Sequence, residues 1–148
     1  MHCVILDACF RRDGKPYGNR NYDWKDTAIP RDEIRWLEKD LAKSKKPVVV
    51  FAHQRLDVVN AHGVKNSPAV RKVLEASGRV LAVFQGHNHV NELKWIREIP
   101  YLTLAAAVEG AGVENGAHAI VDLHPDGVLK IQGFRQQADH RVKPRQSL

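Results

Sequence analysis

The sequence predicts an α/β fold, built as a mixed sheet with flanking helices and an antiparallel hairpin towards the C-terminus. Three apolar runs at residues 2–9, 47–52 and 79–85 predict buried strands, because continuous runs of this length are typical of strands covered on both faces. Two helical patterns lie between these runs, and short strands with turns follow after residue 91. This order of elements is typical of layered α/β folds.

Two amphipathic helices are expected between the apolar runs. The first follows a long polar loop at residues 11–28 and begins near Pro30, whose missing N–H is tolerated in a first helical turn. The second begins at Ser67-Pro68 in the same way, and Gly78 is positioned to end it. The apolar faces follow helical spacing and consist of Ile34, Leu37 and Leu41 in the first helix and Val70, Val73 and Leu74 in the second.

Shorter strands are expected in the second half of the chain, at residues 101–105, 117–123 and 128–134. Pro125-Asp126-Gly127 separates the last two, and Asp-Gly supplies the positive φ values that tight hairpin turns require. No linker or internal repeat divides the chain, so residues 1–137 are expected to form one α/β domain. Residues 138–148 are expected to be a basic, flexible tail.

Composition limits the class of protein. The chain has 148 residues, of which 43% are hydrophobic and 27% charged, and this balance is that of one globular domain. The longest apolar runs are far shorter than the roughly 20 residues of a membrane span, so no membrane partner is expected. The first residues lack the pattern of a signal peptide, which predicts a cytoplasmic protein. Cys3 and Cys9 are too few for a disulfide scaffold and are expected to face a reduced interior from one strand.

A net charge of +6 favours anionic partners in general, whether phosphate esters, nucleic acids or acidic surfaces, and does not choose among them. The basic residues gather at the end of the first helix and near the C-terminus, where the helix dipole and solvated surface account for them. A nucleic-acid-binding module is not favoured, because the sequence lacks aromatic residues interleaved on a basic face.

The most informative feature is the position of the histidines. His53 directly follows one apolar run, and His87 and His89 follow another immediately after Gly86. Sites in α/β folds are built at the carboxyl ends of buried strands, and a His-x-His pair puts both imidazoles on the same side of an extended backbone. These three histidines are therefore candidate metal ligands. The other five are expected to be ordinary polar residues, although His62 stands apart because it follows His53 on the same loop.

Both strand ends resemble motifs of the calcineurin-like metallophosphoesterases. Val-Val-Val-Phe-Ala-His53 and Gly86-His87-Asn88-His89 are similar to the last two metal-binding motifs of that family. The resemblance extends from about residue 4 to about residue 134 and implies the α/β sandwich of the family. It also implies that His53 and His87 bind one metal and that His89 binds the other. In the family, the two metals polarise a phosphoryl group and hold a hydroxide for in-line attack.

The motifs with which that fold normally opens, Asp-x-His, Gly-Asp and Gly-Asn-His, are absent from this sequence. Gly18-Asn19-Arg20 resembles the third only superficially, with Arg in place of His. The chain therefore resembles the C-terminal half of a metallophosphoesterase. Two close divalent ions would repel each other without a bridging carboxylate, so a single Zn, Mn or Fe ion is expected. Asp7 or Asp57 could supply a carboxylate to it.

The resemblance implies a metal-dependent phosphoesterase that hydrolyses a phosphomonoester or phosphodiester by a metal-bound hydroxide. His53, His87 and His89 are the expected ligands, and Arg55, two residues past His53, is the expected catalytic contact to the phosphate. The expected partners are a small-molecule phosphate ester and a second copy of the chain, which would cover an exposed sheet face and complete the site. The alternative is a non-catalytic metal-binding or interaction module derived from such an enzyme.

Overall fold

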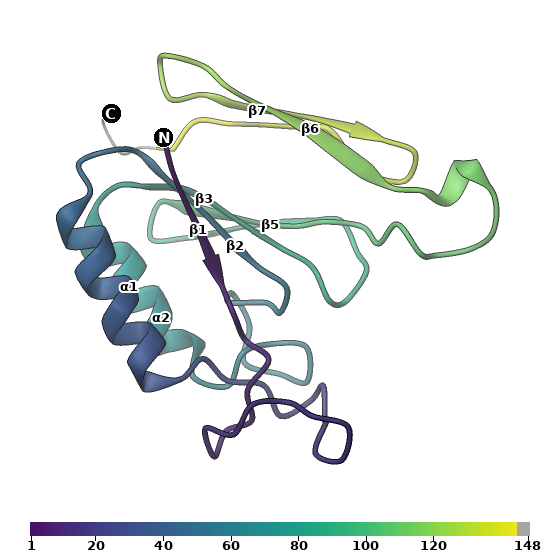
Figure 1. The fold of residues 1–148 in the computed structure, drawn as a ribbon. Helices are drawn as coiled ribbons and strands as arrows, with labels where there is room; N and C mark the ends of the chain where they lie inside the picture. The colour runs from purple at the N-terminus through teal and green to yellow at the C-terminus, as the bar shows by residue number, and fades with distance from the viewer. Residues whose placement is uncertain (145–148) are drawn as a thin grey trace.

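The computed structural model describes residues 1–144, which form three layers: a pair of helices, a five-stranded sheet and a three-stranded sheet (Figure 1). The helices are α1 (Arg31–Lys43) and α2 (Ser67–Ser77). The larger sheet contains, in spatial order, β1 (His2–Leu6), β2 (Val48–Ala52), β3 (Val80–Gln85), β5 (Ile99–Thr103) and β4 (Glu92–Ile96). The smaller sheet contains β6 (His118–Leu123), β7 (Leu129–Phe134) and β8 (His140–Val142), and the short 3-10 helix η1 (Val113–Asn115) precedes it. The expected α/β class, with a mixed sheet, flanking helices and an antiparallel hairpin, is confirmed.

The direction of the strands determines where a site can form. β1, β2, β3 and β5 are parallel neighbours, and only β4 runs antiparallel, beside β5. Phe51 near the end of β2 lies opposite Ile5 of β1 and Phe84 of β3. Because parallel strands end at the same edge of a sheet, this register brings the loops after β2 and β3 side by side.

Both helices begin where the sequence predicts, and α2 also ends at the predicted residue. Pro30 is the N-cap residue of α1, and the buried residues of this helix are Leu37 and Leu41. Gly78 ends α2 in the left-handed conformation, with φ of 64°, and its N–H donates to the Glu75 carbonyl at 3.2 Å. Glycine suits this position because a side chain would be strained at that φ.

Successive side chains along the strands point to opposite faces of the larger sheet, so the apolar residues form two separate cores. Val48 and Val50 of β2 face the core beneath the helices, whereas Val49 faces the smaller sheet. On that second side, Val49, Leu81, Phe84 and Leu102 pack in one core with Leu129, Ile131 and Val142 of β7 and β8. The smaller sheet therefore covers much of this face of the larger sheet. From the sequence alone, a sheet face was expected to be exposed and covered by a second copy of the chain.

The C-terminal hairpin forms as predicted. β6 and β7 pair antiparallel along their whole length, from His118 opposite Phe134 to Leu123 opposite Leu129. At the turn, Gly127 has φ of 78° and the His124 N–H donates to the Val128 carbonyl at 2.8 Å. The chain continues beyond this hairpin into β8, which pairs with β7 over residues 140–142. This part of the expected flexible tail is thus ordered by main-chain pairing, while residues 145–148 lie outside the described chain.

The first strand differs from its expected form. β1 ends at Leu6, so Cys9 lies outside it, and Cys3 and Cys9 are both exposed and form no disulfide. As the edge strand, β1 is covered on one face only, and its Ile5 side chain is 76% exposed. The expectation that this strand is buried on both faces is therefore wrong, because Ile5 lies on an open apolar surface.

Among the described residues, no helix combines the length and apolar character that crossing a membrane would require.

Candidate metal centre

His53 and His87 meet at the carboxyl ends of β2 and β3. His53 directly follows β2, and the Gly86 N–H, at the end of β3, donates to the His53 carbonyl at 3.0 Å. This main-chain bond joins the two loops and leaves the side chains facing each other. The Nδ1 atom of His87 lies 3.3 Å from the Nε2 atom of His53, and the ring centroids are 5.1 Å apart.

The backbone of the His-x-His segment turns instead of remaining extended. His87 and His89 have φ values of 75° and 58°, in the left-handed region, and the Asn88 N–H donates to the Gly86 carbonyl at 3.0 Å. The turn sends the His89 imidazole to a different partner, the carboxylate of Glu109, while His87 faces His53. The expected extended backbone is therefore wrong, although both imidazoles line the same cavity.

His62, which the sequence sets apart without assigning it a role, joins the cluster. Its ring centroid lies 5.8 Å from that of His87. The loop that carries it folds back onto the end of β2, since the Arg55 N–H donates to the His62 carbonyl at 3.2 Å and the Val64 N–H donates to the Arg55 carbonyl at 2.9 Å. Position on the same loop as His53 was the only signal for it in the sequence.

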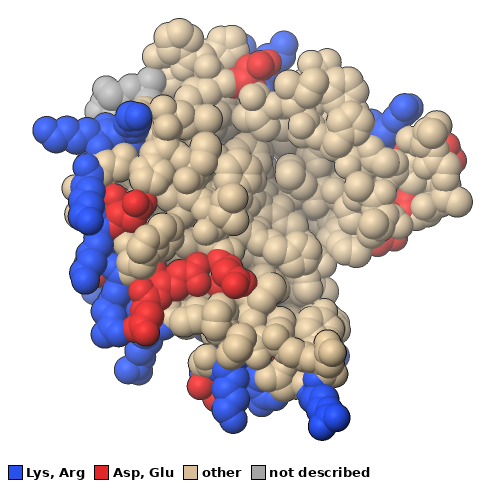
Figure 2. Space-filling model, in the orientation of Figure 1, with Lys and Arg blue, Asp and Glu red and all other residues tan. Residues whose placement is uncertain are grey.

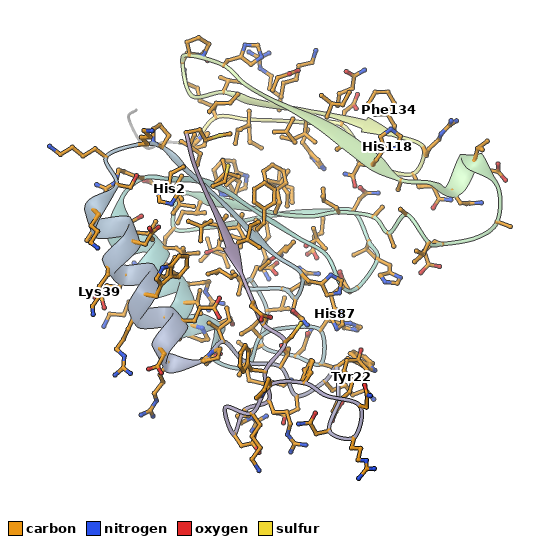
Figure 3. The ribbon with its side chains drawn as sticks, viewed as in Figure 1. His2, Tyr22, Lys39, His87, His118 and Phe134 are labelled. Carbon is orange, nitrogen blue, oxygen red and sulfur yellow. The ribbon has the colours of Figure 1, made fainter. Side chains whose placement is uncertain are left out.

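Trp24 is a second residue that the sequence does not single out. Its ring centroid lies 5.3 Å from His62 and 5.4 Å from His87. The long loop between β1 and α1 therefore reaches the same strand ends, and Figure 3 shows Tyr22 of this loop below His87 at that end of the sheet. Together these residues line an open cavity of about 520 Å³, whose walls are formed by Tyr22, Trp24, His53, His62, His87, Asn88, His89 and Glu109.

The imidazole of His87 favours the neutral form. Burial lowers its pKa, and the nearby His53, His62 and His89 lower it further because a second positive charge would be repelled. The neutral imidazole is the form that binds metals, because one of its nitrogens has a free lone pair. The Nε2 atom of His87 and the Nδ1 atom of His62 are buried in this structure without a hydrogen-bond partner among the described residues.

The pair fits two of the ligands of a transition metal. In a tetrahedral zinc site with bonds of about 2.0–2.1 Å, two nitrogens lie roughly 3.3 Å apart. The Nδ1 and Nε2 atoms of His87 and His53 have this separation, 3.3 Å. Within residues 1–144, however, no group of three or more His, Cys, Asp and Glu side chains is arranged to hold a metal ion. The described residues thus offer part of a coordination shell.

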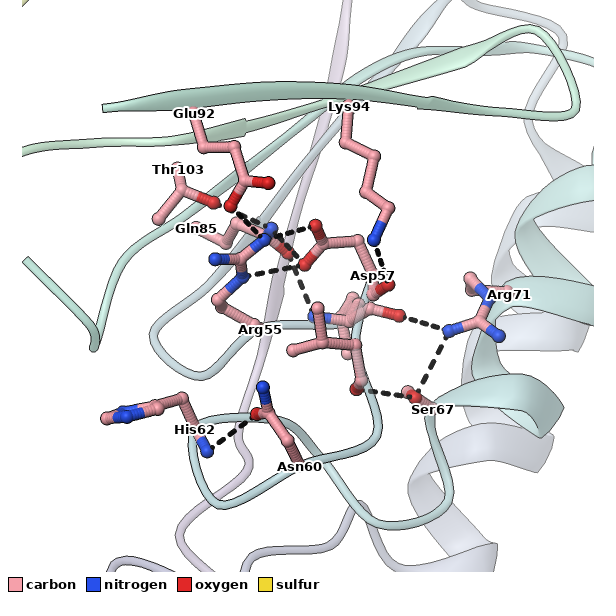
Figure 4. Close-up of polar contacts among 12 residues, drawn as sticks. Arg55, Asp57, Asn60, His62, Ser67, Arg71, Gln85, Glu92, Lys94 and Thr103 are labelled. Atoms are coloured by element: carbon pink, nitrogen blue, oxygen red, sulfur yellow. Dashed lines mark hydrogen bonds and ion pairs between the residues drawn. The ribbon is translucent and has the colours of Figure 1, made fainter. Parts of the chain in front are cut away.

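Arg55 lies away from the histidine cavity. Its Nε donates to Asp57 at 2.9 Å, and its Nη2 lies 2.5 Å from Asp57 and 2.6 Å from Glu92 (Figure 4). Only 4% of this side chain is exposed, because two carboxylates surround the guanidinium. The structure therefore does not bring Arg55 together with the three candidate ligands.

The two carboxylates considered as extra ligands also have other partners. The Asp57 side chain is fully buried and accepts hydrogen bonds from Arg55 and Gln85. Burial raises the pKa of Asp57, but the hydrogen bonds from Arg55 and Gln85 outweigh this effect and the pKa is lowered overall. Asp7 is exposed, and its Oδ1 accepts the Cys9 N–H at 2.8 Å, which is a local turn contact.

A second, apolar cavity adjoins the cluster. It has a volume of about 490 Å³ and shares His53, His87 and His89 with the first, while its other walls include Ile5, Phe51, Phe84 and Leu104. The rings of Phe51 and Phe84 stack at 5.6 Å on its floor. On the face shown in Figure 2, Lys and Arg gather along the edge formed by α1, whereas the hollowed centre is mainly uncharged.

The fold is similar to that of one solved enzyme. A solved dimetal phosphatase from Danio rerio superposes on this chain with a TM-score of 0.71 at 20% sequence identity. The match covers 80% of this chain and 40% of that one, so this chain spans less than half the length of the phosphatase. No protein-family model matches the sequence, and no curated protein sequence matches it either.

Proposed function

We propose that this chain carries a metal-dependent phosphoesterase site, acting on a phosphomonoester or phosphodiester. The single observation that carries the proposal is the 3.3 Å approach of His53 Nε2 and His87 Nδ1 at the ends of two parallel strands. The fold shared with a dimetal phosphatase supports it, as does the lowered pKa of His87.

His53, His87 and His89 are the proposed ligands of a divalent Zn, Mn or Fe ion, and His89 would have to leave Glu109 to join the other two. When bound, such an ion would polarise the phosphoryl group and lower the pKa of coordinated water. His62 lines the same cavity and is proposed as a polar contact to the phosphate ester. Arg55 holds the loop after β2 through Asp57 and Glu92, so we assign it a positioning role in place of a phosphate contact.

The coordination shell needs ligands from outside the described residues, because no group of three is arranged within residues 1–144. We propose that a second copy of the chain supplies them by docking at the open edge of β1. The exposed apolar side chains there, Ile5 at 76% and Phe51 at 40%, adjoin the histidines through the apolar cavity. We also keep the cytoplasm as the proposed location, since both cysteines are free.

The same incomplete shell favours one alternative, a non-catalytic metal-binding or interaction module. Such a module would use the histidine pair to bind an ion and the open edge of the sheet to bind a partner. It needs neither a second metal nor a nucleophile, so it asks less of the described residues, which offer a histidine pair and no larger ligand group.

Metal analysis of the purified protein distinguishes these functions. We expect Zn, Mn or Fe in the wild-type protein, loss of it in His53→Ala and His87→Ala, and normal content in His124→Ala, whose exposed side chain lies on the β6–β7 turn. Turnover of a bis-aryl phosphate with added Mn or Zn would support the phosphoesterase. Bound metal and self-association without turnover would support the module, and metal content that does not depend on either histidine would exclude both.

A further inference from the structure

The loop between β1 and α1 presents two aromatic side chains to the histidine cavity. Tyr22 is 64% exposed, and Trp24 is partly buried against the histidines. Both line the cavity of about 520 Å³ that also contains His53, His62 and His87. One part of the cavity wall is thus aromatic, and the rest consists of four imidazoles with Asn88 and Glu109.

The aromatic wall is held in place by its own loop. The Tyr17 ring meets the Tyr22 ring edge to face, with centroids 5.2 Å apart. The Tyr17 hydroxyl donates to the carbonyl of Asp23 at 2.9 Å and lies 3.2 Å from that of Asp26. These bonds fix the backbone on both sides of Trp24, so the exposed ring of Tyr22 is supported from behind rather than free to collapse into the core.

The loop is in turn attached to the body of the protein. The Thr27 hydroxyl donates to the Ala8 carbonyl, and the Thr27 carbonyl accepts the Lys65 N–H at 2.8 Å. Trp24 itself approaches two imidazoles, at 5.3 Å and 5.4 Å, and the ammonium of Lys25 lies 5.1 Å from its ring. Lys25 is exposed, and its long side chain can rotate away from the indole. A planar group could then take its place over the ring.

We propose that Tyr22 and Trp24 form a subsite for the planar ring of an aryl- or base-bearing phosphate ester, whose phosphoryl group lies against the histidines. This inference rests on the proposed phosphoesterase function and adds the class of substrate. The physical reason is that stacking removes exposed aromatic surface from water and adds ring-to-ring attraction, and the preformed wall loses little conformational freedom on binding.

Calorimetric titration with two non-hydrolysable probes tests the subsite. Phenylphosphonate and methylphosphonate carry the same anionic group and differ in the ring, so their affinity ratio measures the contribution of the ring, and variants of Trp24 separate the aromatic wall from the adjoining apolar cavity. With Zn²⁺ present, we expect the wild-type protein to bind phenylphosphonate about tenfold more tightly than methylphosphonate. The ratio should fall to about one in Trp24→Leu and be largely kept in Trp24→Phe.

Two further variants complete the design. Tyr22→Leu should reduce the affinity ratio without disturbing the fold, because its side chain is mostly exposed. Trp36→Leu is the matched control, since Trp36 is 47% exposed on α1 and lines neither cavity beside the histidines. Its ratio should equal that of the wild type.

Equal affinity of the wild-type protein for the two probes would overturn the subsite while leaving the proposed function intact, because methylphosphonate binding reports on the histidines. If Trp24→Leu and Tyr22→Leu both kept the wild-type preference for phenylphosphonate, the subsite would be overturned as well. Failure of both probes to bind would count against the subsite and the proposed phosphoesterase together.

Discussion

The side-chain amide of Gln85 donates to the carboxylate of Asp57 at 2.6 Å, which joins the last residue of β3 to the loop that follows β2. The carbonyl oxygen of the same amide accepts the Leu56 N–H at 2.8 Å, and its nitrogen also donates to the Thr103 hydroxyl at 3.0 Å (Figure 4). Gln85 lies two residues before His87, and Asp57 lies four residues after His53. This contact therefore sets how the two histidine-bearing loops lie against each other.

Replacing Gln85 by Leu should lower the free energy of unfolding by about 1–3 kcal/mol, because the buried Leu56 N–H and the Asp57 carboxylate would each lose a partner. Chemical denaturation measures this change. Gln132→Leu, on the exposed side of β7, is the matched control and should change stability by less than about 0.5 kcal/mol. Equal stability of the Gln85→Leu variant and the wild type would show that this amide does not hold the loops.

The ion pair of Asp57 with Arg55 should make stability depend on acid pH. The pKa of Asp57 is lowered from its ordinary value of 3.8 in the folded protein, so the pair contributes its full stability above that value. This contribution is lost as the pH falls through the lowered pKa. Asp57→Asn should therefore be less stable than the wild type by about 3–5 kcal/mol at pH 7, and the difference should shrink at pH 3.

Urea unfolding at pH 7, 5 and 3 checks this dependence. The difference between wild type and Asp57→Asn should be the same at the first two values and smaller at the third. Asp122→Asn, an exposed substitution on β6, should differ from the wild type by less than about 0.5 kcal/mol at pH 7. A difference for Asp57→Asn that stays constant down to pH 3 would contradict the lowered pKa.

Gly63 supports the position of His62 by close backbone contact. A Cβ atom on Gly63 would lie 2.2 Å from the Val58 carbonyl oxygen, a main-chain atom that cannot move alone. Gly63→Ala should lower the free energy of unfolding by about 1–3 kcal/mol or displace the loop that carries His62. In Gly18→Ala, the nearest atom to the new Cβ is a side-chain oxygen at 3.6 Å, so the thermal midpoint should barely change. Comparable midpoints for the two variants would contradict this account.

The hydroxyl of Tyr101 is buried in β5 and has no hydrogen-bond partner among residues 1–144. Burial also raises the pKa of Tyr101 well above its ordinary range. Removing the hydroxyl should cost nothing, so Tyr101→Phe should equal or exceed the wild type in stability by up to about 1 kcal/mol. Tyr101→Ala, which also removes the ring, should lose about 3–5 kcal/mol. A marked loss of stability in Tyr101→Phe would contradict the unpartnered hydroxyl.

Local chemistry made much of the fold predictable from the sequence. Pro30 and Gly78 act through their own backbone geometry, and Asp126-Gly127 specifies a hairpin turn without help from distant residues. β4 was not predicted, because its pattern is dominated by exposed residues such as Lys94. β8 was missed because it is short and depends on a partner strand, β7.

The candidate site was predictable only where it coincides with strand ends. His53 and His87 follow apolar runs directly, so their proximity follows from parallel pairing of β2 and β3. Trp24 and His62 come from long loops, and tertiary contacts alone bring them to the cluster. The burial of Arg55 depends on Glu92, which is distant in sequence and belongs to the unpredicted β4.

The left-handed backbone at His87 and His89 lowers the stability of the fold at the same two residues that supply imidazoles to the cavity. A side chain in that conformation costs about 1 kcal/mol or more relative to glycine, and two such residues lie within one turn. Glycine at either position would relax the backbone and remove an imidazole from the cavity. A laboratory selection for thermal stability alone would therefore enrich glycine at these two positions and erase the histidine cluster.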